Sequence, residues 1–190
     1  MGQTPDVGME REMQELHMKA CLYAGVNYAG HIREDGLSQW EYQIGPCKGV
    51  EIGDHLLVSR YLLYRVAEMM GVNVTMKPKP IKSYGSGGHL NFSTNKMREQ
   101  GGIESIIKMY DPTFGAENAE RLKESHWSPS MEFHAEIGDK WSSSVRIPSM
   151  VSVNGKGYLE DRRPPSNLDP YAASEALVRA CILGEFLKQK

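Results

Sequence analysis

Apolar positions recur at helical spacing in three parts of the chain. In residues 9–24 they lie three or four apart up to Gly25, so the spacing predicts an amphipathic helix there. A second helix is predicted from Asp54, a residue type that caps helix N-termini, to Gly71, a residue type at which helices end. The same spacing predicts a third helix over residues 171–190.

The segments between these helices have the composition of β-strands. Residues 26–44 shift to aromatic and β-branched side chains around a turn signal at Asp35-Gly36, which predicts a hairpin. Residues 125–141 are aperiodic, and we interpret them as a loop with short structured pieces. The order of the elements predicts an α+β fold, with an antiparallel sheet flanked by helices. Further strands are predicted at residues 72–76, 89–93 and 142–147.

Length and composition narrow the class of protein. A chain of 190 residues suits one domain or part of one, with no internal repeat and no obvious linker. The net charge of -2 argues against a nucleic-acid partner. The absence of a long apolar run argues against a membrane span. Three widely spaced cysteines suit reduced thiols, so we expect a cytoplasmic protein.

Several side chains could serve phosphoryl transfer. Such a site needs a divalent cation, which takes carboxylate and occasional imidazole ligands, and Glu41, His89 and Glu160 supply these groups. It also needs guanidinium groups to match phosphate oxygens, which Arg146 and the Arg162-Arg163 pair supply. The plainer alternative stays open at this point, because an isolated glutamate is usually a solvated surface residue and a lone histidine a structural one.

A series of short motifs gives these residues a common context. Together the motifs resemble the eukaryotic-type glutamine synthetases from about residue 16 to about residue 182. The resemblance implies that residues 1–190 are a partial catalytic domain, without the family's N-terminal domain and first catalytic strands. It also implies the family reaction, in which ATP phosphorylates the side chain of L-glutamate and ammonia displaces the phosphate to give L-glutamine. The motifs occupy residues 20–25, 39–49, 53–55, 77–81, 89–94, 146–148 and 157–164.

The resemblance implies roles for the candidate ligands. Glu41 matches a ligand of the cation next to the glutamate and ammonium site. His89 and Glu160 match two ligands of a second cation that bridges the ATP phosphates, and Mg2+ or Mn2+ is the implied ion. Arg146 matches an arginine that contacts ATP phosphate, and Arg162 matches one that steadies the glutamate carboxylate and the transferred phosphoryl group. These two arginines are therefore the catalytic candidates.

Other residues are implied to lie near the substrates. Asn91, Ser93 and Tyr158 match positions near the nucleotide, and Gly85 belongs to a glycine-rich segment that matches the family's substrate loop. The implied partners are ATP, L-glutamate and ammonium. Further copies of the chain, or full-length glutamine synthetase subunits with which it co-assembles, are implied as protein partners.

Three positions depart from the family pattern. Lys48 stands where the family has a second glutamate for the cation site of Glu41. Unit charges about 4 Å apart interact by roughly 4 kcal/mol at an effective dielectric of 20, so the exchange replaces attraction by repulsion unless the lysine stem turns away. Trp127 occupies the position where the family has a glutamate of the loop that closes over the site. Trp141 occupies the position where the family has an arginine that stabilises the phosphoryl transition state.

These departures leave three hypotheses open. The chain is an enzyme of the family, a non-catalytic relative that binds partners, or a degenerate product that folds only in part because its sheet has open edges. We predict weak or no glutamine synthesis by the chain alone.

Overall fold

The computed structural model describes residues 6–81, 84–107, 135–138 and 143–184. The chain divides into two compact units, Met1–Thr75 and Met76–Lys190, and each is described by itself. Within the described ranges, no helix is long and apolar enough to cross a membrane.

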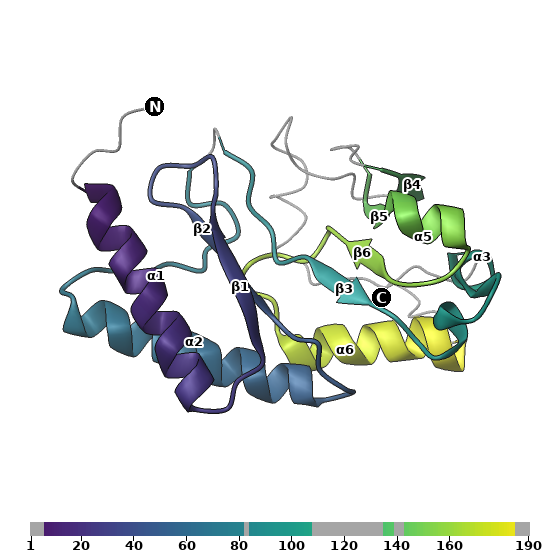
Figure 1. Ribbon diagram of the computed structural model, residues 1–190, viewed down its shortest axis with the longest axis horizontal. Coiled ribbons are helices and arrows are strands. Elements are labelled where there is room, and N and C mark those ends of the chain that lie inside the picture. Colours follow the sequence, from purple (N-terminus) through teal and green to yellow (C-terminus); the bar gives the residue numbers. More distant parts are fainter. Residues whose placement is uncertain (1–5, 82–83, 108–134, 139–142, 185–190) are drawn as a thin grey trace, which may run out of the picture. The chain divides into compact units, whose positions relative to one another are not determined.

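The first unit packs helices against a hairpin (Figure 1). Helix α1 spans Asp6–Tyr23 and helix α2 spans Glu51–Met69. Strands β1, Tyr28–Arg33, and β2, Trp40–Ile44, pair antiparallel. The predicted first helix and the predicted hairpin are therefore confirmed.

Two expectations for this part of the chain are wrong. Asp54 does not cap α2, because the helix begins at Glu51, and Asp54 lies in its first turn. An acidic side chain in the first turn still complements the helix dipole. Residues 72–76 form no strand. Their alternation reflects half-buried and exposed positions in turn, but a strand also requires a neighbouring strand to bond with.

A buried polar cluster lies in the core of the first unit. His17 is 0 % exposed, and its Nε2 lies 3.0 Å from the carbonyl oxygen of Ser59 and 3.2 Å from Sγ of Cys21. The rings of Tyr28 and Tyr42 meet the imidazole edge-on, with centroids at 5.5 and 4.9 Å. Burial lowers the pKa of His17, so the ring is neutral in the folded state at neutral pH.

The second unit is built on a four-stranded sheet of order β3-β6-β5-β4. Strand β6 pairs antiparallel with both β3 and β5, whereas β4 pairs parallel with β5. The strands are β3 Leu90–Phe92, β4 Ala135–Ile137, β5 Val145–Ile147 and β6 Leu159–Asp161. The helical segments are η1 Lys96–Arg98, α3 Gly102–Ile107, α5 Ser149–Asn154, α6 Pro170–Val178 and the π-helical η2 Arg179–Leu183.

These elements confirm the predicted α+β fold with mainly antiparallel pairing. The strands expected at 89–93 and 142–147 are present in shorter form as β3 and β5. Strand β4 is one of the short structured pieces expected within 125–141. The third predicted helix begins at Pro170, where the Asp169 carboxylate accepts hydrogen bonds from the next backbone N–H groups, and residues 185–190 lie outside the described ranges.

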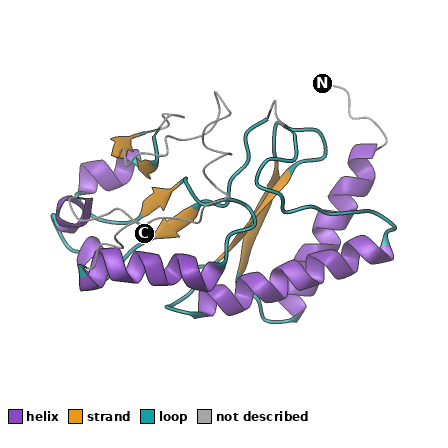
Figure 2. Ribbon diagram, turned by 180° about the vertical axis from the view of Figure 1, so that it is seen from behind, coloured by secondary structure: helices purple, strands orange, loops and turns teal. Residues whose placement is uncertain are grey.

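The two faces of this sheet differ in character. One face packs Val145 and Leu159 into an apolar core with Leu177 of α6 and Met97 of η1. Helix α6 runs along the sheet in both views (Figures 1 and 2). Because side chains alternate along a strand, the residues between these core positions project from the opposite face. That opposite face carries the candidate site.

Candidate functional site

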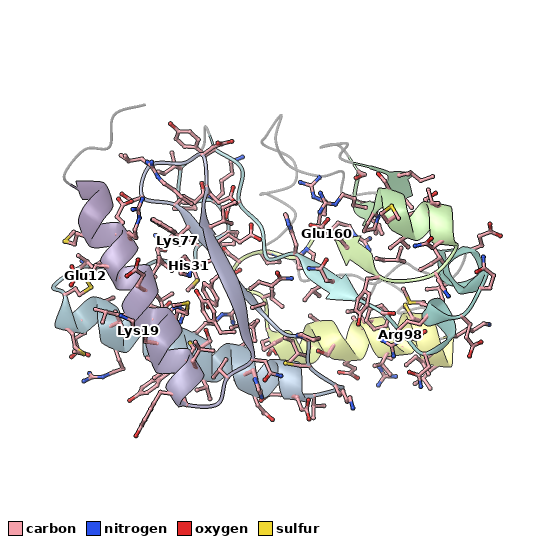
Figure 3. All side chains as sticks on the ribbon, viewed as in Figure 1. Glu12, Lys19, His31, Lys77, Arg98 and Glu160 are labelled. Atoms are coloured by element: carbon pink, nitrogen blue, oxygen red, sulfur yellow. The ribbon has the colours of Figure 1, made fainter. Side chains whose placement is uncertain are left out.

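The register of the sheet aligns three polar residues across adjacent strands. Glu160 in the middle of β6 lies opposite Asn91 on β3 and opposite Arg146 on β5. His89 immediately precedes β3 and is two residues from Asn91, so it projects from the same side. Figure 3 shows the Glu160 side chain extending from β6 beside β3. Three sequence motifs that lie far apart in the chain therefore meet on one face.

Glu160 is the centre of this group. The residue is 6 % exposed, and its Oε1 lies 3.1 Å from Nδ1 of His89. Its Oε2 forms an ion pair with Nε of Arg146. Burial opposes ionisation most strongly, but the hydrogen bond from His89 and the positive charges of His89, Arg146 and Arg162 outweigh it and lower the pKa of Glu160. Glu160 is thus a carboxylate at neutral pH.

Arg162 follows on the same face of the strand end. It is 7 % exposed, and its backbone N–H donates to the carbonyl oxygen of Ser144 at 2.9 Å. Since Arg146 is only half-buried, the group presents one guanidinium near the surface and one deeper in the unit. This arrangement has the charge to receive an anion with several oxygens.

His89 is held in place by the backbone of Gly88. The Gly88 N–H donates to the carbonyl oxygen of Pro164 at 2.9 Å. A Cβ at position 88 would lie 2.4 Å from the carbonyl oxygen of Pro165 and 2.6 Å from Cδ2 of Leu168. Only glycine permits this approach, which brings the chain before β3 against the chain after β6.

A second contact gathers the residues expected near the nucleotide. The Ser93 hydroxyl donates to the carbonyl oxygen of Gly157 at 2.8 Å, which places Ser93 next to the residue preceding Tyr158. Tyr158 is 42 % exposed, and Asn91 is exposed on its strand. Gly85 is half-buried. The roles that the sequence predicts for these residues remain predictions.

Comparison with known proteins identifies the family of this chain. Residues 4–101 match the family model described as glutamine synthetase, catalytic domain. The chain belongs to the glutamine synthetase family. It is 46 % identical to glutamine synthetase of Gallus gallus over 197 aligned residues, covering 95 % of this chain and 52 % of the relative. Identity is 45 % to the Rattus norvegicus and Homo sapiens glutamine synthetases, with 95 % and 92 % of this chain covered and 52 % and 51 % of the relatives. The chain thus spans about half the length of the curated relatives it matches.

The sequence predicts Glu41 as a ligand of a separate cation site, and this residue lies in the first unit. Glu41 is exposed on β2, opposite Ile32 of β1. The Lys48 side chain is exposed just before α2, and its backbone N–H donates to Oε2 of Glu51 at 2.9 Å. Glu41 and His89 belong to different units, so the ligand role of Glu41 stays a prediction. Trp127 and Trp141 lie outside the described residues.

The donors around Glu160 fit a divalent cation in part. An imidazole nitrogen and a carboxylate oxygen 3.1 Å apart are of the right chemistry and close enough to share an ion. Across the described ranges, however, no three His, Cys, Asp or Glu side chains gather closely enough to hold a metal ion. The ion pair of Arg146 also occupies the second carboxylate oxygen. A cation at His89 and Glu160 therefore needs further oxygen ligands, such as those of a phosphate chain.

One sequence prediction in this region needs correction. The sequence makes Arg163 a candidate for phosphate binding together with Arg162, but its guanidinium donates to the buried carboxylate of Asp161. The reason is strand alternation, which turns residues 161 and 163 away from the polar face. Asp161 was missed as a residue of interest. An acid and an arginine two residues apart at a strand end are the signal that points to it.

Proposed function

We propose that this chain carries the nucleotide-binding side of a glutamine synthetase site, and that by itself it makes little or no glutamine. The observation that supports the first part is the Glu160 carboxylate, held between Nδ1 of His89 and Nε of Arg146 on one sheet face. The family reaction is the ATP-dependent ligation of ammonia to L-glutamate. Both units belong, in this proposal, to one partial catalytic domain of a cytoplasmic protein.

Each residue of the polar face has a role in this proposal. His89 and Glu160 would hold Mg2+ or Mn2+, which supplies positive charge at the phosphate oxygens when bound. Arg146 exchanges its contact with Glu160 for a phosphate oxygen. Arg162 orients the carboxylate of L-glutamate and the transferred phosphoryl group.

The remaining candidates line the approach of the substrates. In the proposal Asn91, Ser93 and Tyr158 contact the nucleotide, and Gly85 contacts L-glutamate. The hydrogen bond from Ser93 to Gly157 supports a shared role for Ser93 and Tyr158, because it fixes the spacing of their two strand ends.

The proposed lack of glutamine synthesis rests on the cation site of Glu41 and on two tryptophans. Lys48 puts an ammonium group where the family pattern has the carboxylate that joins Glu41, and a positive charge at such a site opposes a divalent ion. Tryptophan at 127 and 141 supplies neither a carboxylate nor a guanidinium for the ammonium pocket and the transition state. Each of these exchanges removes a different part of the chemistry.

The test combines a binding measurement with an activity assay on the purified chain. Calorimetric titration with MgATP is expected to show binding that Glu160→Ala abolishes. The matched control is Glu175→Ala on α6, an exposed glutamate whose loss leaves the binding unchanged. Incubation with ATP, Mg2+, L-glutamate and ammonium is expected to yield no glutamine above background. Glutamine formation that disappears in Glu160→Ala would contradict the proposed inactivity, and absence of MgATP binding would contradict the nucleotide role.

A second candidate function is co-assembly with full-length glutamine synthetase. Helix α2 favours it, because it exposes Leu57, Tyr61 and Tyr64 along one side. Co-expression with a full-length subunit, followed by size-exclusion chromatography, is expected to give a mixed complex that Tyr61→Lys weakens. Separate elution of the two proteins would count against this function.

A further inference from the structure

A carboxylate lies on the apolar face of the second unit's sheet. Asp161 pairs in register with Leu90 on β3 and Val145 on β5, both of which belong to or pack on the apolar core. Its exposure is 0 %. A charged group in such surroundings is retained only with strong hydrogen-bonding compensation.

Arg163 provides a directional form of that compensation. Its backbone N–H and Nε donate to Oδ1 of Asp161 at 2.9 and 3.1 Å, and its Nη2 lies 2.7 Å from Oδ2. Arg163 is itself only 4 % exposed. The two-pronged contact fixes both the distance and the plane of the two groups, which an ammonium group could not do.

The surroundings of the apolar face agree with the position of Asp161 on that face. Burial raises the pKa of the Cys181 thiol of η2 to about 12, and the negative charge of Asp161 adds to the effect. The Asp161 carboxylate therefore faces the helical layer, on the side opposite to His89 and Arg146.

Alternation connects this buried pair to the candidate site. Glu160 and Arg162 alternate along the chain with Asp161 and Arg163. The contact between Asp161 and Arg163 on the apolar face therefore holds the backbone from which the two site residues project. The Arg162 N–H is bonded to Ser144, and the next residue after Arg163, Pro164, accepts from Gly88 beside His89. A shift of this backbone moves Glu160, Arg162 and His89 together.

We propose that Asp161 and Arg163 form a positioning pair, which acts from the buried face of the sheet to set Glu160, Arg162 and His89 for a metal–nucleotide complex. This inference rests on the proposed nucleotide role of that face and adds to it the residues that determine its geometry. The pair touches no substrate in this account. Its effect is exerted through the backbone of residues 160–164.

The Arg163→Lys variant tests whether the geometry of the contact with Asp161 matters apart from its positive charge. The variant keeps a cation near Asp161 and loses the two-pronged contact. Its matched control is Arg179→Lys at the start of η2, where the arginine bonds Glu175 of α6 at 2.7 Å on the surface. Should Arg163→Lys fail to fold, the double variant Asp161→Asn/Arg163→Met removes both charges, keeps an acceptor for the backbone N–H of residue 163 and fills the same space.

The first readout requires no ligand. The 15N signals of the His89 ring, assigned with His89→Gln, report whether Nδ1 carries the proton donated to Glu160. At a fixed pH of about 7.5, the unchanged chain and Arg179→Lys are expected to show this protonated Nδ1. Arg163→Lys and the double variant are expected to show a mixture of tautomers. A loss of stability alone does not produce that change in the folded protein.

The second readout is the calorimetric dissociation constant for MgATP. We expect it to rise about tenfold or more in Arg163→Lys, a change of about 1.4 kcal/mol, and to stay constant in Arg179→Lys. Unchanged His89 signals in a folded variant overturn the positioning role, as does unchanged MgATP affinity. If the unchanged chain binds no MgATP while the His89 signals shift as expected, the proposed function fails and the positioning of His89 by the pair stands.

Discussion

Asp161→Asn is expected to be strongly destabilising, because it leaves a buried charge behind. Asp161 is 0 % exposed and Arg163 is 4 % exposed. Asparagine preserves the Oδ1 acceptor for the Arg163 backbone but presents an amide or a weaker acceptor to the guanidinium Nη2, which lies 2.7 Å from Oδ2. Removing one member of a buried ion pair typically costs about 3–5 kcal/mol, out of a total stability of roughly 5–15 kcal/mol.

Urea unfolding followed by circular dichroism measures this loss. The control Glu175→Gln acts on a side chain that is 61 % exposed and pairs with Arg179, so its expected cost is about 0–1 kcal/mol. The double variant Asp161→Asn/Arg163→Met removes the stranded charge and is expected to recover most of the stability. A loss for Asp161→Asn no larger than that of the control would refute the reasoning, as would a double variant less stable than Asp161→Asn.

Three further predictions concern other parts of the chain. Because the pKa of buried His17 is lowered, the unfolded state binds its proton first, so stability is constant well above pH 6.5 and falls as the pH drops through about 6.5 toward the folded pKa. His17→Gln is expected to flatten the pH profile of urea unfolding, and an unchanged slope contradicts the assignment. Lys48→Glu is expected to tighten Mn2+ binding about tenfold or more in calorimetry, with Lys48→Gln in between. Equal Mn2+ affinity in all three proteins would contradict the proposed effect of Lys48 on the cation site. Gly88→Ala is expected to cost about 1–3 kcal/mol in urea unfolding and to weaken MgATP binding, since the Cβ would meet Pro165, whereas Gly30→Ala, with open space around it, serves as the control.

Apolar spacing predicts the helices, and the aromatic and β-branched composition around the Asp35-Gly36 turn predicts the hairpin, because both signals are local in sequence. Helix α1, the β1–β2 hairpin and α6 all lie close to their predicted positions. The wrong start of α2 is a boundary error of three residues, whereas the wrong strand concerns a partner that is not local. Whether residues 72–76 pair with a strand depends on a neighbour that no local pattern reveals.

In the candidate site, too, the sequence predicts the individual residues but not their non-local partners. The motifs identified Glu160, His89 and Arg146 as candidates, but only the register of β3, β6 and β5 shows that they meet. The buried contact of Arg163 could not be read from composition, since arginines in a row all suggest phosphate binding until alternation assigns them to opposite faces.

The most direct test of the central claim is the rate of glutamine formation by the purified chain under saturating MgATP, L-glutamate and ammonium. The account predicts a rate indistinguishable from that of Glu160→Ala, although the unchanged chain holds the nucleotide. A rate clearly above that of Glu160→Ala would contradict it.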